Sequence, residues 1–109
     1  MSTPEQRLDK QIMIYCGQRG WMCFHTNVGR VMTADGRMFD TGLPAGWPDL
    51  LIIKQGGIVE FCETKIHPRK PTEKQLKMLE LLQNYGFKSY VAYSLDEFIE
   101  KTLYNEKDR

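Results

Sequence analysis

Apolar side chains recur at helical spacing within residues 1–20, at Leu8, Ile12, Tyr15 and Cys16. This spacing is typical of a helix with one buried face. Thr3 and Gln6 stand at the spacing of a capping box where such a helix would begin, and Gly20 is a suitable residue to end it. The pattern therefore predicts a helix at the beginning of the chain.

Shorter apolar stretches bounded by turn residues predict strands over residues 21–26, 49–53, 58–65 and 87–93, with a hairpin over 31–40. Asp35-Gly36 is the turn signal of the hairpin, and Gly56-Gly57 turns the chain between two of the strands. The run from Leu50 to Ile53 is apolar without interruption, which indicates burial on both faces. Residues 41–47 contain two glycines and a proline and are predicted to form a loop.

Two further helices follow. Thr72 and Gln75 have the spacing of a second capping box, and Ser94 with Glu97 caps the last helix. The apolar positions of the two helices are Leu76, Leu79, Leu82 and Tyr85, then Leu95, Phe98, Ile99 and Leu103. The predicted order is α-β-β-β-β-α-β-α, with the hairpin arms counted loosely. A helix between two strands is a crossover, so we expect a parallel pair within a mixed sheet that carries helices on both faces. The fold class is α/β.

Charged residues stand at the ends of two of these apolar strands. Glu63 and Lys65 are two apart and point to one side of their strand, whereas Thr64 points to the other. Because the Gly-Gly turn makes an antiparallel hairpin, Asp49 is expected opposite this segment. Two adjacent carboxylates repel unless a cation lies between them, and Mg²⁺ favours such oxygen ligands. A nearby lysine can position or deprotonate a water, or offset phosphate charge. An alternative is that both acids are surface charges paired with Lys54 or Lys65.

Two other polar residues are ambiguous. Glu5 shares a helix face with Leu8 and Ile12, so it would point toward the sheet, where it could join a metal site. It could equally serve only as an acid in the first turn of a helix. Gln75 shares a face with Leu79, so its amide could reach the strand end at Lys65, or it could act only in its capping box.

A basic segment follows the strand end directly and suits contacts with phosphate groups. It contains Lys65, Arg69, Lys70, Lys74 and Lys77, with His67, against a single acid, Glu73. Arg30 and Arg37, near His25 at the hairpin, could extend the same surface. The alternative is an ordinary solvated loop and helix start. We assign His25 no catalytic role.

Composition narrows the class of protein. The chain has 109 residues, 41% of them apolar, and a formal net charge of +1, so it is expected to be one domain over residues 1–109. Nucleic-acid binding would depend on a local patch because the overall charge is so small. Cys16, Cys23 and Cys62 fit no zinc spacing and are predicted to be buried, reduced thiols. There is no membrane-spanning run or signal-peptide pattern, so we expect a soluble, cytoplasmic protein that does not engage a membrane.

Taken together, these residues resemble the VRR-NUC family, virus-type replication-repair nucleases of the PD-(D/E)xK superfamily. The resemblance covers nearly the whole chain. It rests on an early helical Glu5, on Gly46 with Pro48-Asp49 before an apolar strand, on Glu63-x-Lys65, and on Gln75 in the next helix. It implies a single-domain, restriction-endonuclease-like fold with a mixed central sheet flanked by helices.

The resemblance also implies roles for these residues. Asp49 and Glu63 would bind Mg²⁺ or Mn²⁺, with the main-chain oxygen of Thr64 and, directly or through water, Glu5. Lys65 would position or activate the attacking water. Gln75 would support the site or contact the scissile phosphate.

A chain with this domain alone is similar to the stand-alone phage members, which would place it in the host cell cytoplasm. Those members resemble Holliday-junction resolvases, which work as homodimers. Our hypothesis is thus a metal-dependent, structure-selective DNA endonuclease that acts on branched or junction DNA in phage replication or repair. Three alternatives remain: a catalytically inactive DNA-binding module, a monomeric nuclease that cuts flaps or nicks, and a purely structural domain.

Overall fold

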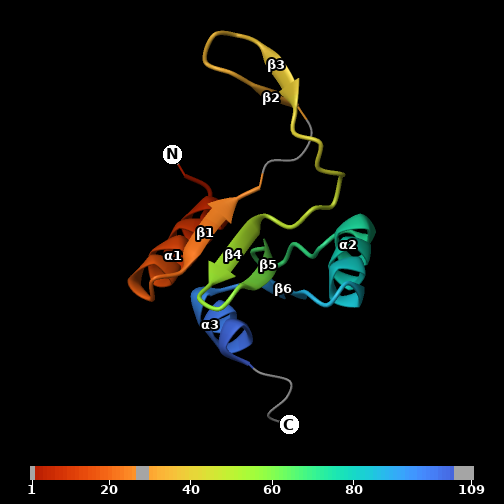
Figure 1. Cartoon of the computed structure of the whole chain (residues 1–109). Coiled ribbons are helices and arrows are strands. Elements are labelled where there is room, and N and C mark those ends of the chain that lie inside the picture. Colours follow the sequence, from red (N-terminus) through yellow and green to blue (C-terminus); the bar gives the residue numbers. More distant parts are fainter. Residues whose placement is uncertain (1, 27–29, 105–109) are drawn as a thin grey trace.

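The computed structural model describes residues 2–26 and 30–104 (Figure 1). Its elements are α1 Pro4–Gln18, β1 Met22–His25, β2 Arg30–Met32, β3 Met38–Asp40, β4 Leu50–Lys54, β5 Ile58–Thr64, α2 Glu73–Asn84, β6 Lys88–Ala92 and α3 Leu95–Leu103. Five strands thus precede α2, whereas the predicted order had four strands there. The difference is the hairpin, whose arms are the separate strands β2 and β3 of three residues each.

Strands β1, β4, β5 and β6 form a mixed sheet in that order. The pairs β1–β4 and β4–β5 are antiparallel and β5–β6 is parallel. The α2 crossover joins the two parallel strands, as predicted. The helices cover both faces, with α1 and α3 on one side and α2 on the other (Figure 1). The predicted α/β class is confirmed.

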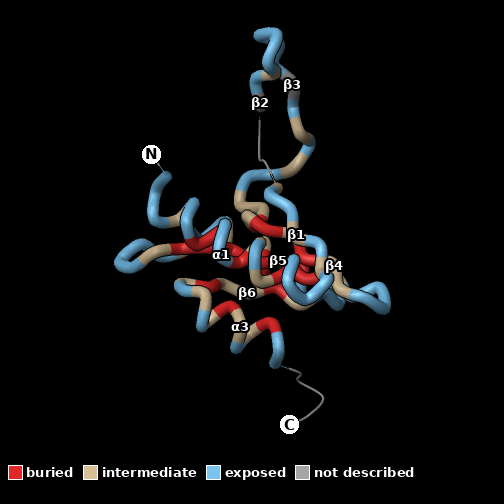
Figure 2. The backbone as a smooth tube through the Cα atoms, turned by 90° about the vertical axis from the view of Figure 1, so that its left-hand side faces the viewer, coloured by how far each residue is buried: buried red, intermediate tan, exposed pale blue. Residues whose placement is uncertain are grey.

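The main core lies between the sheet and the α1–α3 layer, because alternate strand residues face that layer. It consists of Leu8, Ile12, Cys16, Leu50, Ile52, Cys62, Ala92 and Phe98. Figure 2 shows this buried band running through the centre of the molecule. On the other face, the ring of Phe61 packs edge-on against Trp47 and Phe87. Leu51 and Ile53 are only half-buried, so the predicted burial of β4 on both faces is too strong.

The β2–β3 hairpin forms a separate two-stranded sheet. It projects away from the main sheet in both views (Figures 1 and 2). The turn forms where the sequence predicts it, with Gly36 at a φ of 85°, a conformation that favours glycine. An isolated hairpin has little stability of its own.

Both predicted capping boxes are present. The Thr3 hydroxyl accepts the Gln6 N–H at 3.1 Å while the Gln6 side chain accepts the Thr3 N–H at 2.9 Å, and Thr72 and Gln75 repeat the arrangement. The predicted apolar stripe of α2 is wrong at its ends. Leu79 and Leu82 are buried, whereas Leu76 and Tyr85 are 51% and 73% exposed, because the helix crosses the sheet only along its middle turns.

The three cysteines carry free thiols, two of them buried and Cys23 half-buried. The predicted burial is therefore confirmed for Cys16 and Cys62 and is only partial for Cys23. No helix within the described ranges is long and apolar enough to cross a bilayer.

Candidate active site at the ends of β4 and β5

Asp49 and Glu63 meet at one end of the sheet. The register pairs Leu50 with Cys62, so the residues one step further out, Asp49 and Glu63, lie opposite each other. The Asp49 carboxylate also accepts the backbone N–H of Thr64 at 3.0 Å, through Oδ2. The convergence predicted from the hairpin geometry is therefore what the β4–β5 pairing produces.

A negative charge on Glu63 is unfavourable in this position. Its side chain is 1% exposed, and burial, followed by the neighbouring Asp49 carboxyl, raises the pKa of Glu63 to about 9. Its Oε1 atom is buried and has no hydrogen-bond partner within the described part of the chain. A buried carboxylate oxygen with no donor is costly, so the position favours a proton or a cation beside Glu63.

Lys65 lies on the same side of the strand as Glu63, as the alternation of a strand requires. Its Nζ atom is 3.9 Å from Glu63 Oε2, and its side chain is 7% exposed. The alternative pairing with Lys54 is wrong, because Lys54 lies toward the opposite end of the strands and pairs with Glu60 at 2.7 Å. Lys65 therefore places one buried positive charge near the two acids, too far from Glu63 for a short ion pair.

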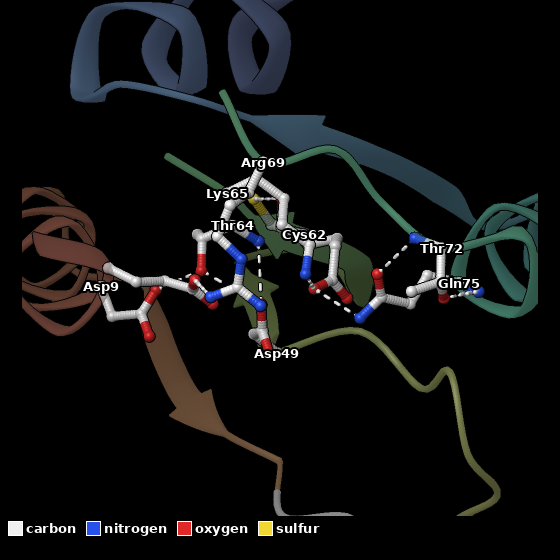
Figure 3. Close-up of polar contacts among 10 residues, drawn as sticks. Asp9, Asp49, Cys62, Thr64, Lys65, Arg69, Thr72 and Gln75 are labelled. Atoms are coloured by element: carbon white, nitrogen blue, oxygen red, sulfur yellow. Dashed lines mark hydrogen bonds and ion pairs between the residues drawn. The ribbon is translucent and has the colours of Figure 1, made fainter. Parts of the chain in front are cut away.

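Gln75 performs both of the functions that the sequence left as alternatives. Its Oε1 atom accepts the Thr72 N–H at 2.8 Å, which completes the cap of α2. Its Nε2 atom donates to Glu63 Oε2 at 3.3 Å. The start of α2 is thereby tied to the strand end (Figure 3).

Glu5 lies at the rim of this site. Its side chain is 28% exposed and its Oε2 atom is 3.9 Å from Arg69 Nη1. The expectation that Glu5 points into the interior is thus met only in part, because it lies in the first turn, where α1 begins to clear the sheet. Its charge still contributes to raising the pKa of Glu63.

The acid of α1 that does point inward is Asp9, which the sequence analysis missed. Asp9 is 6% exposed. Its Oδ1 atom lies 2.6 Å from Thr64 Oγ1, and the same hydroxyl lies 3.1 Å from Asp49 Oδ2 (Figure 3). The other oxygen of Asp9 faces His25 Nδ1 at 3.8 Å. A signal was available, since Asp9 precedes Ile12 and Cys16 by three and seven residues and so shares their buried face.

The Thr64 hydroxyl has a single proton and two carboxyl neighbours. It donates to Asp9 Oδ1 at 2.6 Å, and its longer contact, 3.1 Å, is with Asp49 Oδ2. Burial raises the pKa of Asp9, while the hydrogen bond from Thr64 lowers it. Side chains from α1 and α2 thus approach the strand ends from opposite sides.

The predicted basic residues fall into two groups. Arg69, Lys70, Lys74 and Lys77 follow β5 in the loop and the first turns of α2, and Arg69 faces Glu5, whereas Arg30 and Arg37 belong to the β2–β3 hairpin. Lys77 pairs with Glu73 at 3.1 Å and Arg37 with Asp35 at 3.3 Å, and Lys70 and Lys74 are exposed. One continuous basic surface over both groups is therefore not what the fold provides.

A cavity of about 340 Å³ lies between the start of α1 and the loop after Lys65. Its polar lining includes Glu5, Asp9, His67 and Arg69. His67 is held by stacking on Tyr93, with ring centroids 4.1 Å apart. The cavity therefore opens beside Glu5 and Asp9, and its lining includes neither Asp49 nor Glu63.

Asp49 and Glu63 are the residues that could hold a divalent metal ion. Two carboxylates with water in the remaining positions suit Mg²⁺, and the orphaned Glu63 Oε1 fits a cation. Within the described ranges, no three His, Cys, Asp or Glu side chains are grouped closely enough to form a complete metal cluster.

A mixed sheet between helical layers, with an Asp and a Glu-x-Lys at adjoining strand ends, defines the class: the chain is a nuclease-fold domain. One solved structure described as a VRR_NUC domain is similar to it, with a TM-score of 0.69 and 27% identity over 91% of this chain and 97% of that one. A second, described as a VRR_NUC domain protein, has a TM-score of 0.65 and 21% identity over 92% of this chain and 85% of that one. No protein-family model and no curated protein matches the sequence. The fold and the motif support membership of the VRR-NUC family.

Proposed function

We propose that this domain is a metal-dependent, structure-selective DNA endonuclease that uses Mg²⁺ or Mn²⁺. The observation that carries the proposal is the pair of facing acids, half-buried Asp49 and buried Glu63, with Lys65 Nζ 3.9 Å from Glu63. A purely structural pair of this kind would be costly, because Glu63 Oε1 has no partner within the described residues. A divalent cation would remove that cost and would serve phosphodiester hydrolysis.

Each residue then has a chemical function. Asp49 and Glu63 would hold the metal ion, with the main-chain oxygen of Thr64, and Glu5 would add an outer contact. The bound ion would supply Lewis-acid polarisation of the phosphate and lower the pKa of a bound water. Lys65 positions the attacking water, or offsets charge on the phosphate. Gln75 holds the Glu63 carboxylate in orientation through its 3.3 Å contact.

DNA approaches the site over the loop and α2. Arg69, Lys70, Lys74 and Lys77 are exposed in the loop and the first turns of α2, and such cations contact phosphate groups without reading the sequence. Their position supports recognition of backbone shape, as expected for a structure-selective enzyme. Arg30 and Arg37 lie on the hairpin, and we propose that they contact a second arm of branched DNA.

The preferred substrate in this proposal is a four-way junction cut by a homodimer, in phage replication or repair. A domain with one site that cuts two strands symmetrically needs a second copy. A monomer would suit a flap or a nick better, and a chain that binds DNA without turnover would be an inactive module.

The proposal predicts that Asp49→Ala and Lys65→Ala each lower cleavage of a labelled four-way junction at least about a hundredfold, because each removes a group that acts on the reacting phosphate. Cleavage is measured in Mg²⁺, in Mn²⁺ and with EDTA. Thermal unfolding monitors the fold of each variant.

Glu80→Gln, an exposed acid on α2, is the matched control and should cleave like the wild type. Wild-type cleavage in both site variants would rule out the assigned residues. Tight binding by the wild type, with no cutting in either metal, would instead establish the inactive module.

A further inference from the structure

We propose that Asp9 is a positioning residue of the nuclease site, which acts through the hydroxyl of Thr64 on the Asp49 carboxylate. The inference rests on the proposed function and extends it to a residue outside the motif. Asp9 lies on α1, whereas Asp49 and Thr64 lie at the ends of two strands, and the three side chains form a continuous chain of contacts (Figure 3).

The first step is the commitment of one oxygen of Asp49. Its Oδ2 atom accepts the Thr64 N–H at 3.0 Å and lies 3.1 Å from the Thr64 hydroxyl. Both contacts come from a residue that is fully buried and held between two strands. Asp49 Oδ1 is then the oxygen that remains for a cation, and Thr64 fixes its direction.

The second step is the orientation of the Thr64 hydroxyl itself. A threonine hydroxyl rotates about its own bond and needs a second partner to fix it. Asp9 Oδ1 is that partner, at 2.6 Å. This distance lies within the range expected for a strong O–H···O bond to a carboxylate. Without Asp9, Thr64 Oγ1 loses the contact that fixes its position 3.1 Å from Asp49 Oδ2.

The third step is the cost of placing an acid here. Asp9 is 6% exposed and lies on the α1 face that otherwise packs apolar side chains against the sheet. An apolar residue would fill such a position without desolvating a carboxyl group. The thermal stability of α1 packing therefore does not account for Asp9, whereas orientation of a metal ligand does, since such outer partners set metal affinity in many sites.

The experiment uses two pairs of variants, one pair at Asp9 and one at Thr64. In each pair, one substitution removes the hydrogen-bonding group and the other retains one. Asp9→Ala removes the carboxyl and Asp9→Asn keeps a hydrogen-bonding group of the same size. Thr64→Val removes the hydroxyl and Thr64→Ser keeps it. Mn²⁺ binding to the protein without DNA is measured by calorimetry, and kcat and KM for junction cleavage are measured separately. Glu80→Gln is the control, and unfolding curves report the fold.

The expected result is that Asp9→Ala and Thr64→Val each weaken Mn²⁺ binding about tenfold or more and lower kcat, with KM for DNA unchanged. Asp9→Asn and Thr64→Ser should remain close to the wild type. The Asp9→Ala/Thr64→Val double variant should lose no more Mn²⁺ affinity and kcat than the more impaired of the two single variants. The reason is that both substitutions break the same chain of contacts.

Several outcomes overturn the inference. Equal losses in Asp9→Asn and Asp9→Ala would make Asp9 a direct ligand, and additive losses in the double variant would separate it from Thr64. Unchanged Mn²⁺ binding in both removing variants would give Asp9 no role at the site. If Asp9→Ala does not fold, the Thr64 pair and Asp9→Asn decide alone.

Failure of the proposed function is visible separately. A wild-type protein that binds Mn²⁺ but cuts no DNA refutes the nuclease proposal, while the binding comparison still tests Asp9. A wild-type protein that binds no Mn²⁺ refutes both.

Discussion

Glu63 shows how a single residue can be held in a position that its own chemistry disfavours. It is 1% exposed, faces a second acid, and has one oxygen with no partner within the described residues. Gln75 and Lys65 stabilise only its other oxygen. The fold tolerates this cost because β5 is paired on both sides, with β4 and β6. In the proposed function, a bound cation would offset it.

This conflict predicts an unusual pH dependence for the metal-free protein. The pKa of Glu63 rises from 4.5 to about 9 on folding, so the folded state retains a proton that the unfolded state loses. Stability from this group is complete below about pH 4.5 and is lost as the pH rises toward 9, with a slope of at most about 1.4 kcal/mol per pH unit. Glu63→Gln should therefore flatten the curve and raise the melting temperature at pH 8 in EDTA, while abolishing cleavage.

Thermal unfolding between pH 5 and about 9 checks this prediction. Glu80→Gln, whose carboxyl is exposed, controls for the loss of one charge. A Glu63→Gln variant that melts below the wild type at pH 8 would mean that the carboxylate is stabilised by its surroundings, contrary to the geometry described above.

At the scale of elements, the loop before β4 positions α2. Gly46 has a φ of 91°, and a Cβ atom there would lie 2.8 Å from the backbone oxygen of Lys74 and 2.9 Å from its carbonyl carbon. The loop therefore runs directly against the first turn of α2, which carries Gln75. The glycine in the Gly-x-Pro-Asp motif is explained by this close approach of two backbones.

Gly46→Ala should accordingly destabilise the domain and disturb the site. The backbone conformation alone costs about 1–2 kcal/mol for a residue with a Cβ atom, and the clash adds to it by displacing the turn that holds Gln75. We expect a free energy of unfolding lower by about 2–4 kcal/mol, and a lower kcat for DNA cleavage.

Gly42→Ala is the matched control for Gly46→Ala, because Gly42 has a φ of 79° in the same loop and a Cβ atom there would meet nothing within 4 Å. It should show the conformational cost without the displacement of α2. Denaturant titrations measure both variants. If the two lose equal stability and activity, the contact with Lys74 has no effect.

The whole molecule presents its two sheet edges differently. The outer carbonyls of β6 are covered by side chains, since Gln83 Nε2 donates to Ser89 O at 2.9 Å and Lys101 Nζ donates to Val91 O at 2.6 Å. The opposite edge, β1, exposes Met22 and Phe24 at 50% and 47%. Side chains that occupy edge carbonyls discourage pairing with another chain, so β6 is not prepared for a partner strand.

Oligomeric state is the property that separates the candidate substrates. If the protein is the proposed homodimer, light scattering at micromolar concentration should give twice the mass of the chain, and both strands of a four-way junction should be cut within one binding event. Mass measurement and a two-strand cleavage assay on a supercoiled cruciform test this together. A monomer that cuts a flap faster than a junction would favour the flap-nuclease alternative.

Much of this architecture follows from local patterns. The capping residues Thr3 and Thr72 mark where α1 and α2 begin, because capping depends on residues three apart. The Gly56-Gly57 turn likewise brings Asp49 opposite Glu63, because strand pairing about a turn fixes the register. For the same reason, the side of the strand on which Glu63 and Lys65 lie could be predicted from alternation alone.

Other features depend on how distant segments pack. Asp9 lies 55 positions from Thr64 along the chain, and only the angle at which α1 crosses the sheet brings them to 2.6 Å. The same crossing leaves Glu5 at the rim of the site, paired with Arg69. Glu5 and Asp9 are both spaced along α1 so as to share a face with apolar residues, so spacing alone does not distinguish them. The separation of the hairpin arginines from the basic loop is also a result of packing.

The sequence by itself determined the helices, the strands and the meeting of Asp49 with Glu63, because these depend on spacing, capping and turns within short segments. The tertiary structure decided which acid of α1 reaches the site, how Gln75 joins its cap to Glu63, and why Gly46 must lack a side chain. Those outcomes depend on the distances between elements remote in the chain, and such distances are set by the packing of the core as a whole.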